Sequence, residues 1–489
     1  MSEDRFILVL DEGTTSTRAI LYSAAGRQVA VAQEELTQHY PAAGLVEHDA
    51  AEIWDRTLRC ARAMVDRAGG AQRIAGIGVT NQRETVVAWD RATGQPLCRA
   101  IVWQDRRGEQ RCAELREAGH EAAVQATTGL LLDPYFSATK MAWVLANVDD
   151  AAALGPRLAL GTVESWLVWN LTGGLHVSDV TNASRTSLFP LTGRSWDDGL
   201  CDLFGVPRAA LPEIVPNSGP IGVTRLDLFG AAIPITGMAG DQQAATLGQG
   251  CFSPGQTKAT LGTGAFVLAN MGAQPPRSEH RLLGTVLCEV DGARLYALEG
   301  AVFVAGSLVK WLRDSIGMLG SATESEALAR SVPDSGGVTV VPALSGLGAP
   351  YWRPDARGSI TGLSFATTRA HIVRAALESV ANMFHDLAGA FSADGAHWSV
   401  LRLDGGMSAN DWIAQDIANM LAIPCERPDD VETTARGAMI LAAIGAGLRD
   451  GLSGARDMLA TSQVFTPGID DPDRALRIAN WQAALREQG

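Results

Sequence analysis

Apolar residues along this chain fall mostly into short continuous runs, and such runs are typical of strands buried on both faces of a sheet. One run covers 6–10, stops at a polar stretch and resumes at 19–22. This arrangement predicts two paired strands joined by a hydroxyl-rich turn. Further runs predict strands at 74–80, 86–89, 100–103 and 400–403.

Helices are predicted where apolar residues recur every three or four positions. In 49–69, the acids Asp49 and Glu52 have the spacing of a capping box at a helix N-terminus. The same periodicity predicts a helix over 371–387, and a run rich in Gly and Ala at 437–448 is typical of a packed core helix. Strands and helices that alternate in this way indicate an α/β fold.

The opening strand–turn–strand pattern occurs a second time in the middle of the chain. Residues 257–268 again predict a strand, a Gly/Thr turn at 262–264 and a second strand. Each copy opens a half-chain of similar size, so the sequence favours two related α/β domains, 1–249 and 250–489, that close on one polyphosphate. The alternative is a chance similarity between two Gly/Thr turns.

The first of these turns has the chemistry of a polyphosphate site. Gly13 allows a close backbone approach, and the hydroxyl residues 14–17 offer N–H and O–H donors. Asp11 is a carboxylate suited to a hydrated Mg²⁺ ion. An ordinary polar turn explains the same residues equally well.

A single carboxylate, Asp241, stands in the small-residue stretch 235–248 at a predicted strand-to-helix turn. We expect this side chain to face a cleft. The simpler interpretation is that Asp241 is the N-cap of the following helix.

Polar residues also interrupt the two apolar runs at 74–80 and 86–89. Arg83 and Glu84 stand at the tip of this predicted hairpin, where they are either solvated or supply donors and an acceptor to neighbouring hydroxyl groups. Trp103 ends the next predicted strand, and Tyr135 lies at the edge of a predicted helix. A glycine turn at 404–406 follows a further strand and suits contact with a nucleotide, although a plain strand-to-helix turn explains it equally well.

Composition limits the partners that this chain can have. The 489 residues carry a net charge of −14 with a pI near 5.1, which opposes binding to nucleic acids or anionic membranes. The seven scattered cysteines and the acidic start of the chain favour a reduced, cytoplasmic location without a signal peptide, and no apolar run is long enough for membrane insertion.

Ten segments together, in this order, resemble the FGGY carbohydrate kinases over nearly the whole chain, and most closely the members that phosphorylate glycerol. The segments are 11–18, 81–85, 101–104, 133–136, 181–186, 239–243, 262–264, 298–302, 346–352 and 404–406. The resemblance implies two ribonuclease-H-like domains of the actin, hexokinase and Hsp70 type with an active-site cleft between them. That architecture would also explain the internal repeat.

The resemblance further implies phosphorylation of glycerol to sn-glycerol 3-phosphate with Mg-ATP as the donor. Asp241 would be the general base, and the implied glycerol site consists of Arg83, Glu84, Trp103, Tyr135, Asp241, Gln242 and Phe266. Asp11 would lie beside Mg²⁺. The implied nucleotide site consists of Thr14, Thr15, Ser16, Arg18, Gly262, Thr263, Gly306, Lys310, Gly406 and Asn410. We also expect a homo-oligomer, either a dimer or a tetramer.

Two residues depart from the family pattern near these sites. Glu12 stands where Gln is usual, so a second carboxylate either helps to hold Mg²⁺ or points away from it. Lys310 stands where Gln is usual near the nucleotide.

Two other functions remain possible from the sequence. One is a related kinase that acts on a longer polyol or a ketose, although Arg83, Glu84 and Trp103 favour a short, closed pocket. The other is an actin-like or Hsp70-like nucleotide switch, which would have no use for a site that recognises three hydroxyl groups.

Overall fold

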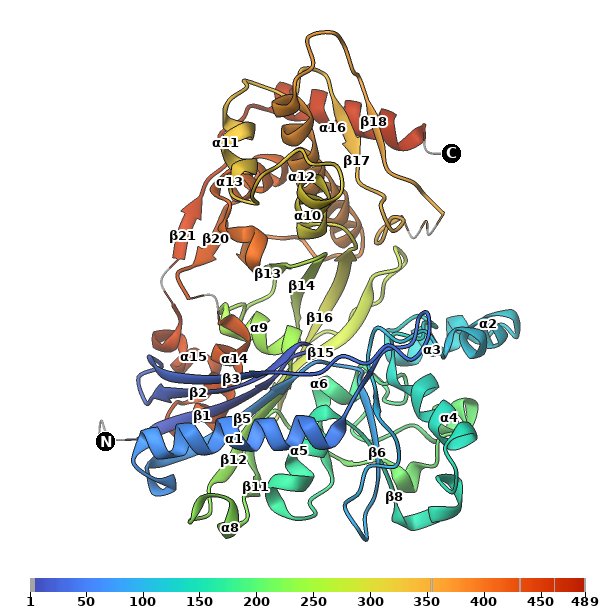
Figure 1. The fold of residues 1–489 in the computed structure, drawn as a ribbon, viewed down its shortest axis with the longest axis vertical. Coiled ribbons are helices and arrows are strands. Elements are labelled where there is room, and N and C mark those ends of the chain that lie inside the picture. The colour runs from blue at the N-terminus through green and yellow to red at the C-terminus, as the bar shows by residue number, and fades with distance from the viewer. Residues whose placement is uncertain (1–4, 352, 354, 431, 461, 488–489) are drawn as a thin grey trace.

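The computed structural model describes residues 5–351, 353, 355–430, 432–460 and 462–487. Figure 1 shows the first half of the chain at the bottom of the view and most of the second half above it. Each half is built around one large twisted sheet.

The first large sheet has six strands and contains both parallel and antiparallel strand pairs. In spatial order the strands are β11 (Ser218–Val223), β12 (Pro234–Gly240), β5 (Ile74–Asn81), β1 (Phe6–Glu12), β2 (Ser16–Ser23) and β3 (Gln28–Glu35). β1, β2 and β3 pair antiparallel, whereas β5 is parallel to both β1 and β12. The predicted strand–turn–strand unit at the start of the chain is therefore confirmed.

The second large sheet has seven strands and repeats this topology. Its order is β15 (Leu283–Val290), β16 (Ala293–Val302), β14 (Ala265–Gly272), β13 (Gln256–Leu261), β19 (Val400–Asp404), β20 (Cys425–Pro428) and β21 (Ser462–Phe465). β13, β14 and β16 pair antiparallel, and β19 is parallel to β13 and β20. The order β16-β14-β13-β19-β20 thus matches β3-β2-β1-β5-β12, as expected for two ribonuclease-H-like domains.

Smaller sheets and the helices complete the structure. One sheet contains β4 (Glu47–His48), β7 (Ala100–Ile101), β6 (Val86–Asp90) and β8 (Leu158–Thr162), and two pairs are β9 (Val177–Asp179) with β10 (Glu213–Val215) and β17 (Thr339–Val341) with β18 (Ser359–Thr361). The α-helices are α1 (Ala50–Ala68), α2 (Glu109–Glu117), α3 (Glu121–Thr128), α4 (Ser137–Asn147), α5 (Val163–Thr172), α6 (Val180–Ala183), α7 (Asp198–Phe204), α8 (Leu226–Phe229), α9 (Asp241–Gly248), α10 (Gly306–Asp314), α11 (Glu324–Arg330), α12 (Arg369–Ala393), α13 (Asp411–Leu421), α14 (Thr433–Gly445), α15 (Gly451–Gly454) and α16 (Asp471–Arg486).

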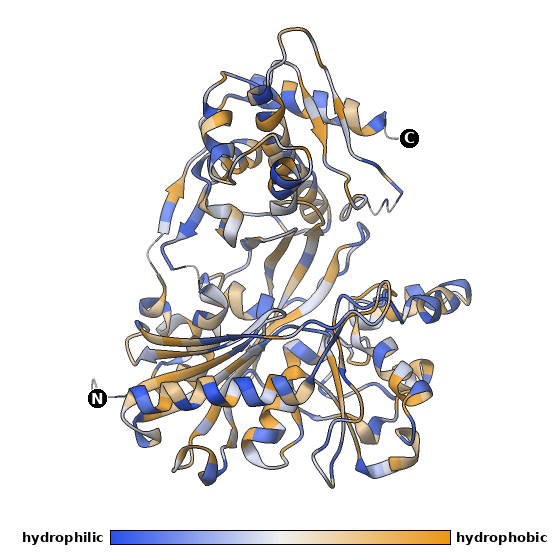
Figure 2. Cartoon of the chain, in the orientation of Figure 1, coloured by the Kyte–Doolittle hydropathy of each residue, from blue (hydrophilic) through white to orange (hydrophobic). Residues whose placement is uncertain are grey.

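Helix α1 shows how local sequence sets these elements. Asp49 is its N-cap and accepts from the backbone N–H groups of Ala51 and Glu52, and Gly69 ends it in the left-handed conformation. The carboxylate of Glu52 bonds to Thr37 instead of completing a capping box. Figure 2 shows that α1 alternates hydrophilic and hydrophobic positions, while β1 and β2 of the first large sheet are mainly hydrophobic. The apolar face of α1 packs on β1, β2 and β3.

Helix α14 comes late in the chain but packs on the first sheet. It contacts β12, β5 and β1, and lies directly against α9. A Cβ atom on Gly437 would lie 1.8 Å from the carbonyl oxygen of Ala244, and one on Gly248 would lie 1.9 Å from that of Thr433. Two glycines therefore allow the backbones of α9 and α14 to touch.

No helix among the described residues has both the length and the apolar composition needed to cross a membrane.

Candidate active site

A small cavity of about 50 Å³ contains all seven residues of the predicted glycerol site. It is lined by Thr14, Arg83, Glu84, Trp103, Tyr135, Asp241, Gln242 and Phe266. These side chains come from segments more than 250 residues apart in the sequence. Phe266 comes from β14 in the second half of the chain, so the cavity is walled by residues of both halves.

The predicted hairpin at 81–85 is wrong, because β5 and β6 belong to different sheets. β5 pairs in the large sheet, whereas β6 pairs with β7 and β8. The connection runs through the interior, so the side chains of Arg83 and Glu84 are only 1% and 2% exposed. Glu84 adopts a φ of 62°, a conformation that strains a residue with a Cβ atom and that occurs mainly at functional positions. The solvated interpretation of these charges is excluded.

Asp241 is the first residue of α9, at the carboxyl end of β12. Gly240 occupies the N-cap position, so the interpretation of Asp241 as the cap is wrong. Its Oδ1 accepts from the N–H of Gln242 at 2.7 Å, and its side chain remains 31% exposed toward the cavity. Burial raises the pKa of Asp241, and the nearby cations Arg83 and Lys258 oppose that shift. Asp241 is thus an accessible carboxylate with increased basicity.

Arg83 places its donors against several acceptors at once. Its Nε lies 3.4 Å from Asp241 Oδ1, and its Nη2 donates to the hydroxyl of Tyr135 at 3.3 Å. Its Nη1 lies 2.6 Å from Glu299 Oε2. Because the guanidinium is planar and fully charged, these contacts fix its orientation at the edge of the cavity.

Two of the three aromatic residues that line the cavity, Trp103 and Tyr135, contact neighbouring segments. The rings of Trp103 and Tyr135 meet edge to face with centroids 5.7 Å apart. The indole Nε1 of Trp103 donates to the hydroxyl of Thr14 at 3.0 Å, which joins the first Gly/Thr turn to the cavity. Lys140 fixes the backbone around Tyr135, because its Nζ donates to the three successive carbonyl groups at 134, 135 and 136.

The first Gly/Thr turn joins β1 and β2 and reaches the cavity through Thr14. Thr15 is exposed at the turn, and its carbonyl accepts from the N–H of Leu36 at 2.9 Å. Ser16 accepts the N–H of Gly13 on its carbonyl at 3.0 Å. These two backbone hydrogen bonds therefore fix the conformation of the turn.

Asp11 and Arg18 lie opposite each other behind this turn. Arg18 Nη2 is 2.8 Å from Asp11 Oδ2, and its Nη1 is 2.5 Å from Glu432 Oε2. Burial raises the pKa of Asp11 to about 6, although the Arg18 guanidinium opposes the shift, while Glu432 and Asp241 add to it. Asp11 is thus a buried carboxylate that is paired with one arginine and has two further carboxylates nearby.

Glu12 points to the opposite face of β1. Successive side chains of a strand alternate between the faces, and Glu12 accepts from the hydroxyl of Thr57 on α1 at 2.7 Å. Burial raises the pKa of this carboxyl to about 8, so it is neutral at pH 7. Of the two alternatives for Glu12, the structure supports the one in which it points away from the phosphate turn.

The second Gly/Thr turn, between β13 and β14, is brought together with the other glycines of the predicted nucleotide site. The N–H of Gly306 at the start of α10 donates to the carbonyl of Gly262 at 2.9 Å, and that of Ala305 donates to Thr263 at 3.0 Å. A Cβ atom on Gly306 would lie 2.5 Å from the Gly262 oxygen, so glycine is required for this approach. Gly406 follows β19, directly beside β13, and faces open space.

Two predicted nucleotide residues have less specific surroundings. Asn410 is the N-cap of α13, where its Oδ1 accepts from the N–H of Ile413 at 3.1 Å. Lys310 is exposed on α10, one turn after Gly306.

Four buried charged residues near the cavity were not predicted as site residues. They are Lys140, Arg185, Lys258 and Glu299. Lys258 Nζ lies 2.5 Å from Gln242 Oε1, and burial lowers its pKa. A single charged residue within an apolar strand or helix is the sequence signal that could have indicated them, because charges are seldom fully buried without a partner.

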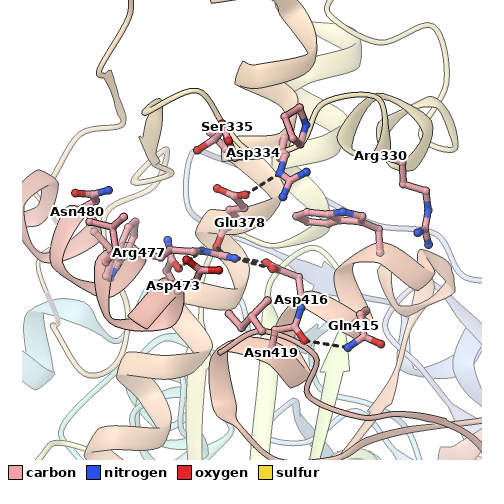
Figure 3. A pocket seen from close by; sticks show the side chains of 18 of the residues that line it. Arg330, Asp334, Ser335, Glu378, Gln415, Asp416, Asn419, Asp473, Arg477 and Asn480 are labelled. Atoms are coloured by element: carbon pink, nitrogen blue, oxygen red, sulfur yellow. Dashed lines mark hydrogen bonds and ion pairs between the residues drawn. The ribbon is translucent and has the colours of Figure 1, made fainter. Parts of the chain in front are cut away.

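A larger groove of about 990 Å³ lies in the second half of the chain, away from the cavity. Figure 3 shows contacts among its polar side chains, including the ion pair of Arg477 with Asp416 and the hydrogen bond from Gln415 to Asn419. None of the described residues that line it belongs to the predicted site. The chemistry proposed below therefore concerns the smaller cavity.

Three comparisons relate this chain to known proteins. The glycerol kinase of Gluconobacter oxydans is 50% identical over 490 residues, which cover 99% of this chain and 96% of that protein. The glycerol kinase of Methylobacterium nodulans is 51% identical, with 98% and 97% covered. The crystal structure of Plasmodium falciparum glycerol kinase with ADP superposes with a TM-score of 0.94 at 34% identity, and covers 99% of this chain and 98% of that one.

Two repeated sheets with a carboxylate cavity between them define the class of carbohydrate kinases with an actin-type fold. Residues 6–248 match the N-terminal domain of the FGGY family of carbohydrate kinases, and residues 257–446 match its C-terminal domain. The chain belongs to this family.

Proposed function

We infer that this chain transfers the γ-phosphate of ATP to a terminal hydroxyl group of glycerol, giving sn-glycerol 3-phosphate. The observation that carries this function is the small cavity, which combines an accessible carboxylate, a fixed guanidinium and two aromatic walls with one Gly/Thr turn. The full-length similarity to proteins named glycerol kinase supports the same substrate.

Recognition of glycerol follows from the donors and acceptors of the cavity. Each hydroxyl group donates and accepts one hydrogen bond or more, so a triol needs both kinds of partner. Arg83 and the Tyr135 hydroxyl supply donors, while Glu84 and Asp241 supply acceptors. Trp103 and Phe266 cover the carbon chain. A buried polar site of this kind rejects analogues that lack a hydroxyl group.

Asp241 is proposed as the general base. Its carboxylate is the exposed acceptor of the cavity, and burial makes it more basic than an ordinary aspartate. It would accept the proton of the attacking hydroxyl group as the bond to phosphorus forms. Thr14 lines the same cavity, so the attacking oxygen would lie next to the first Gly/Thr turn.

The two turns are proposed to hold the phosphates from both sides. Backbone N–H groups and hydroxyls of Thr14, Thr15 and Ser16 would contact the phosphates from one side, together with Arg18. Gly262 and Thr263 would contact them from the other, together with Gly306 and Gly406. Phosphoryl transfer depends mainly on in-line positioning and charge stabilisation, and positioning alone can supply roughly 7 to 11 kcal/mol.

The residues present fit a magnesium ion at Asp11. Mg²⁺ in kinases is held by one or two carboxylates together with phosphate oxygens and water, so it needs no cluster of protein ligands. The described residues contain no group of three or more His, Cys, Asp or Glu that could hold a metal, so the proposed ion would rest on Asp11, phosphate oxygens and water. When bound, the ion would neutralise charge that develops on the phosphates.

The cysteines of the chain bear on where the protein is located. We also propose a cytoplasmic location, because the seven cysteines are all free and suit a reducing compartment. The homo-oligomer remains a prediction.

Replacing the base tests this mechanism. Asp241→Asn keeps the size of the side chain and removes the proton acceptor, so we expect kcat to fall by about 10² to 10⁴. The affinity for ATP, measured by calorimetry, should stay within about twofold of the wild type because Asp241 does not line the nucleotide site. Turnover close to that of the wild type would remove the assignment of the base.

A further inference from the structure

Glu299 lies beneath the cavity and contacts two arginines at once. Its Oε2 is 2.6 Å from Arg83 Nη1, and its Oε1 accepts from Arg83 Nη2 at 3.2 Å, which makes a two-pronged ion pair. Oε1 also accepts from Arg185 Nη2 at 2.8 Å. Arg185 in turn donates through Nε to Glu84 Oε1 at 2.7 Å. One carboxylate therefore contacts Arg83 directly and Glu84 through Arg185, and both of these residues line the cavity.

These four side chains are isolated from water. Arg185 and Glu299 are 0% and 1% exposed, so their contacts are unscreened and their geometry is narrowly fixed. The arginines Arg185 and Arg83 more than offset the effect of burial and lower the pKa of Glu299 to about 2. The carboxylate is consequently charged at neutral pH.

Glu299 reaches this position from the second half of the chain. It lies on β16 between two antiparallel neighbours, opposite Leu268 of β14 and Leu283 of β15. Its place is thus set by the second large sheet, whereas Arg83, Glu84 and Arg185 belong to the first half. The ion pairs of Glu299 therefore connect the second large sheet to the cavity residues of the first half.

Glu299 also determines what Arg83 is available to do. Apart from Glu299, the carboxylates next to Arg83 are Asp241, at 3.4 Å, and Glu84, at 3.7 Å. Without Glu299 the guanidinium would turn toward these two groups and compete with the hydroxyl groups of the substrate for their oxygens. The two-pronged pair instead leaves one edge of Arg83 facing the cavity.

We propose that Glu299 is a positioning residue for glycerol recognition, which acts by holding Arg83 directly and Glu84 through Arg185. This inference rests on the proposed function, because it assigns a role within the same site. It also gives a role to the segments at 181–186 and 298–302, which none of the glycerol or nucleotide contacts explains.

The test is Glu299→Gln in the full chain, measured in two ways. Glutamine keeps the shape and one acceptor but removes the charge, so we expect the KM for glycerol and its dissociation constant without ATP to rise by about 10- to 100-fold, as for a lost charge-assisted hydrogen bond. The KM for ATP should stay within about twofold. Glu299→Asp, which keeps the charge, should recover part of the affinity.

Glu289→Gln is the matched control. Glu289 is also a nearly buried carboxylate of the second sheet, on β15, and pairs with Arg294 at 2.7 Å, but it does not contact the cavity. We expect it to lower thermal stability without changing the affinity for glycerol. If Glu299→Gln does not fold, Glu299→Asp and Arg185→Lys carry the test, and both should weaken glycerol binding.

Two results would overturn the proposal. One is an unchanged affinity for glycerol in folded Glu299→Gln. If that variant does not fold, the corresponding result is an unchanged affinity in Glu299→Asp and Arg185→Lys. The other is an equal loss of affinity in Glu289→Gln, which would indicate a general effect of removing a buried charge. Failure of the proposed function is separate, because it would appear as a wild-type enzyme that does not phosphorylate glycerol.

Discussion

At the scale of single residues, solvent exposure distinguishes two carboxyl groups, those of Asp241 and Glu12. Asp241 is partly exposed at a cavity, whereas Glu12 is fully buried against the hydroxyls of Thr17 and Thr57. Burial raises the pKa of both groups. In Asp241 the effect produces a better base, and in Glu12 it produces a neutral group inside the protein.

The basicity of Asp241 predicts an acid limb in the pH profile of kcat. The residue acts as a carboxylate, so activity is lost as the pH falls through its pKa, which burial places above the ordinary 3.8. The profile should be measured with saturating glycerol, over the range in which circular dichroism shows a folded protein. The residual activity of Asp241→Asn should lack this limb, and a wild-type limb that persists unchanged in the variant would contradict the assignment.

Glu12 predicts a different dependence, in stability rather than in rate. Its pKa rises from 4.5 in the unfolded chain to about 8 in the folded protein, so the unfolded chain loses the proton first as the pH increases. Between these values the group lowers the free energy of unfolding by about 1.4 kcal/mol per pH unit. Glu12→Gln removes this effect, so its stability relative to the wild type should increase from pH 5 to pH 8. Urea denaturation measures the free energies of unfolding of the two proteins. If both change with pH by the same amount across this range, the prediction is wrong.

At the scale of elements, the strands and turns were largely predictable, and the contacts between distant elements were not. Apolar runs at 6–10 and 400–403 predicted β1 and β19, and Asp49 and Gly69 mark the ends of α1. The connection after β5 was mistaken for a hairpin, because two adjacent apolar runs do not show which sheet each will join.

The same limit applies within the site. All seven predicted glycerol residues meet at one cavity, but that prediction came from ordered motifs rather than from periodicity. Glu299 was missed as a site residue, although it is a single charge within an apolar strand. Its partner Arg83 is 216 residues away, and no local pattern relates the two.

The contact between α9 and α14 gives a prediction for one element pair. In Gly437→Ala the added Cβ atom would meet the carbonyl oxygen of Ala244 at 1.8 Å, so α9 must shift and Asp241 with it. We expect a loss of about 1 to 3 kcal/mol in the free energy of unfolding, together with a lower kcat.

The matched control for this substitution is Gly389→Ala. Gly389 lies within α12 and has open space around it, so alanine should stabilise the protein by about 0.5 to 1 kcal/mol. Urea denaturation of both variants checks the pair. Equal effects of the two substitutions would show that the close approach of α9 and α14 does not constrain the fold.

At the scale of the whole molecule, two sheets of the same topology bring together groups that neither sheet holds alone. The first half supplies Asp241, Arg83 and one Gly/Thr turn, and the second supplies Phe266, Glu299 and the other turn. Because phosphoryl transfer depends mainly on positioning, the arrangement of the two halves should matter more for the rate than the basicity of any one residue.

The small volume of the cavity makes acceptor specificity the most direct test of this account. ADP release should be measured with glycerol, erythritol, xylulose and no acceptor, under identical ATP and Mg²⁺ concentrations. We predict that kcat/KM is highest for glycerol by at least about 100-fold, since longer acceptors must displace Trp103 or Phe266, and that release without an acceptor is negligible. ADP release that does not depend on glycerol, or a preference for the longer polyol or the ketose, would contradict the proposed function.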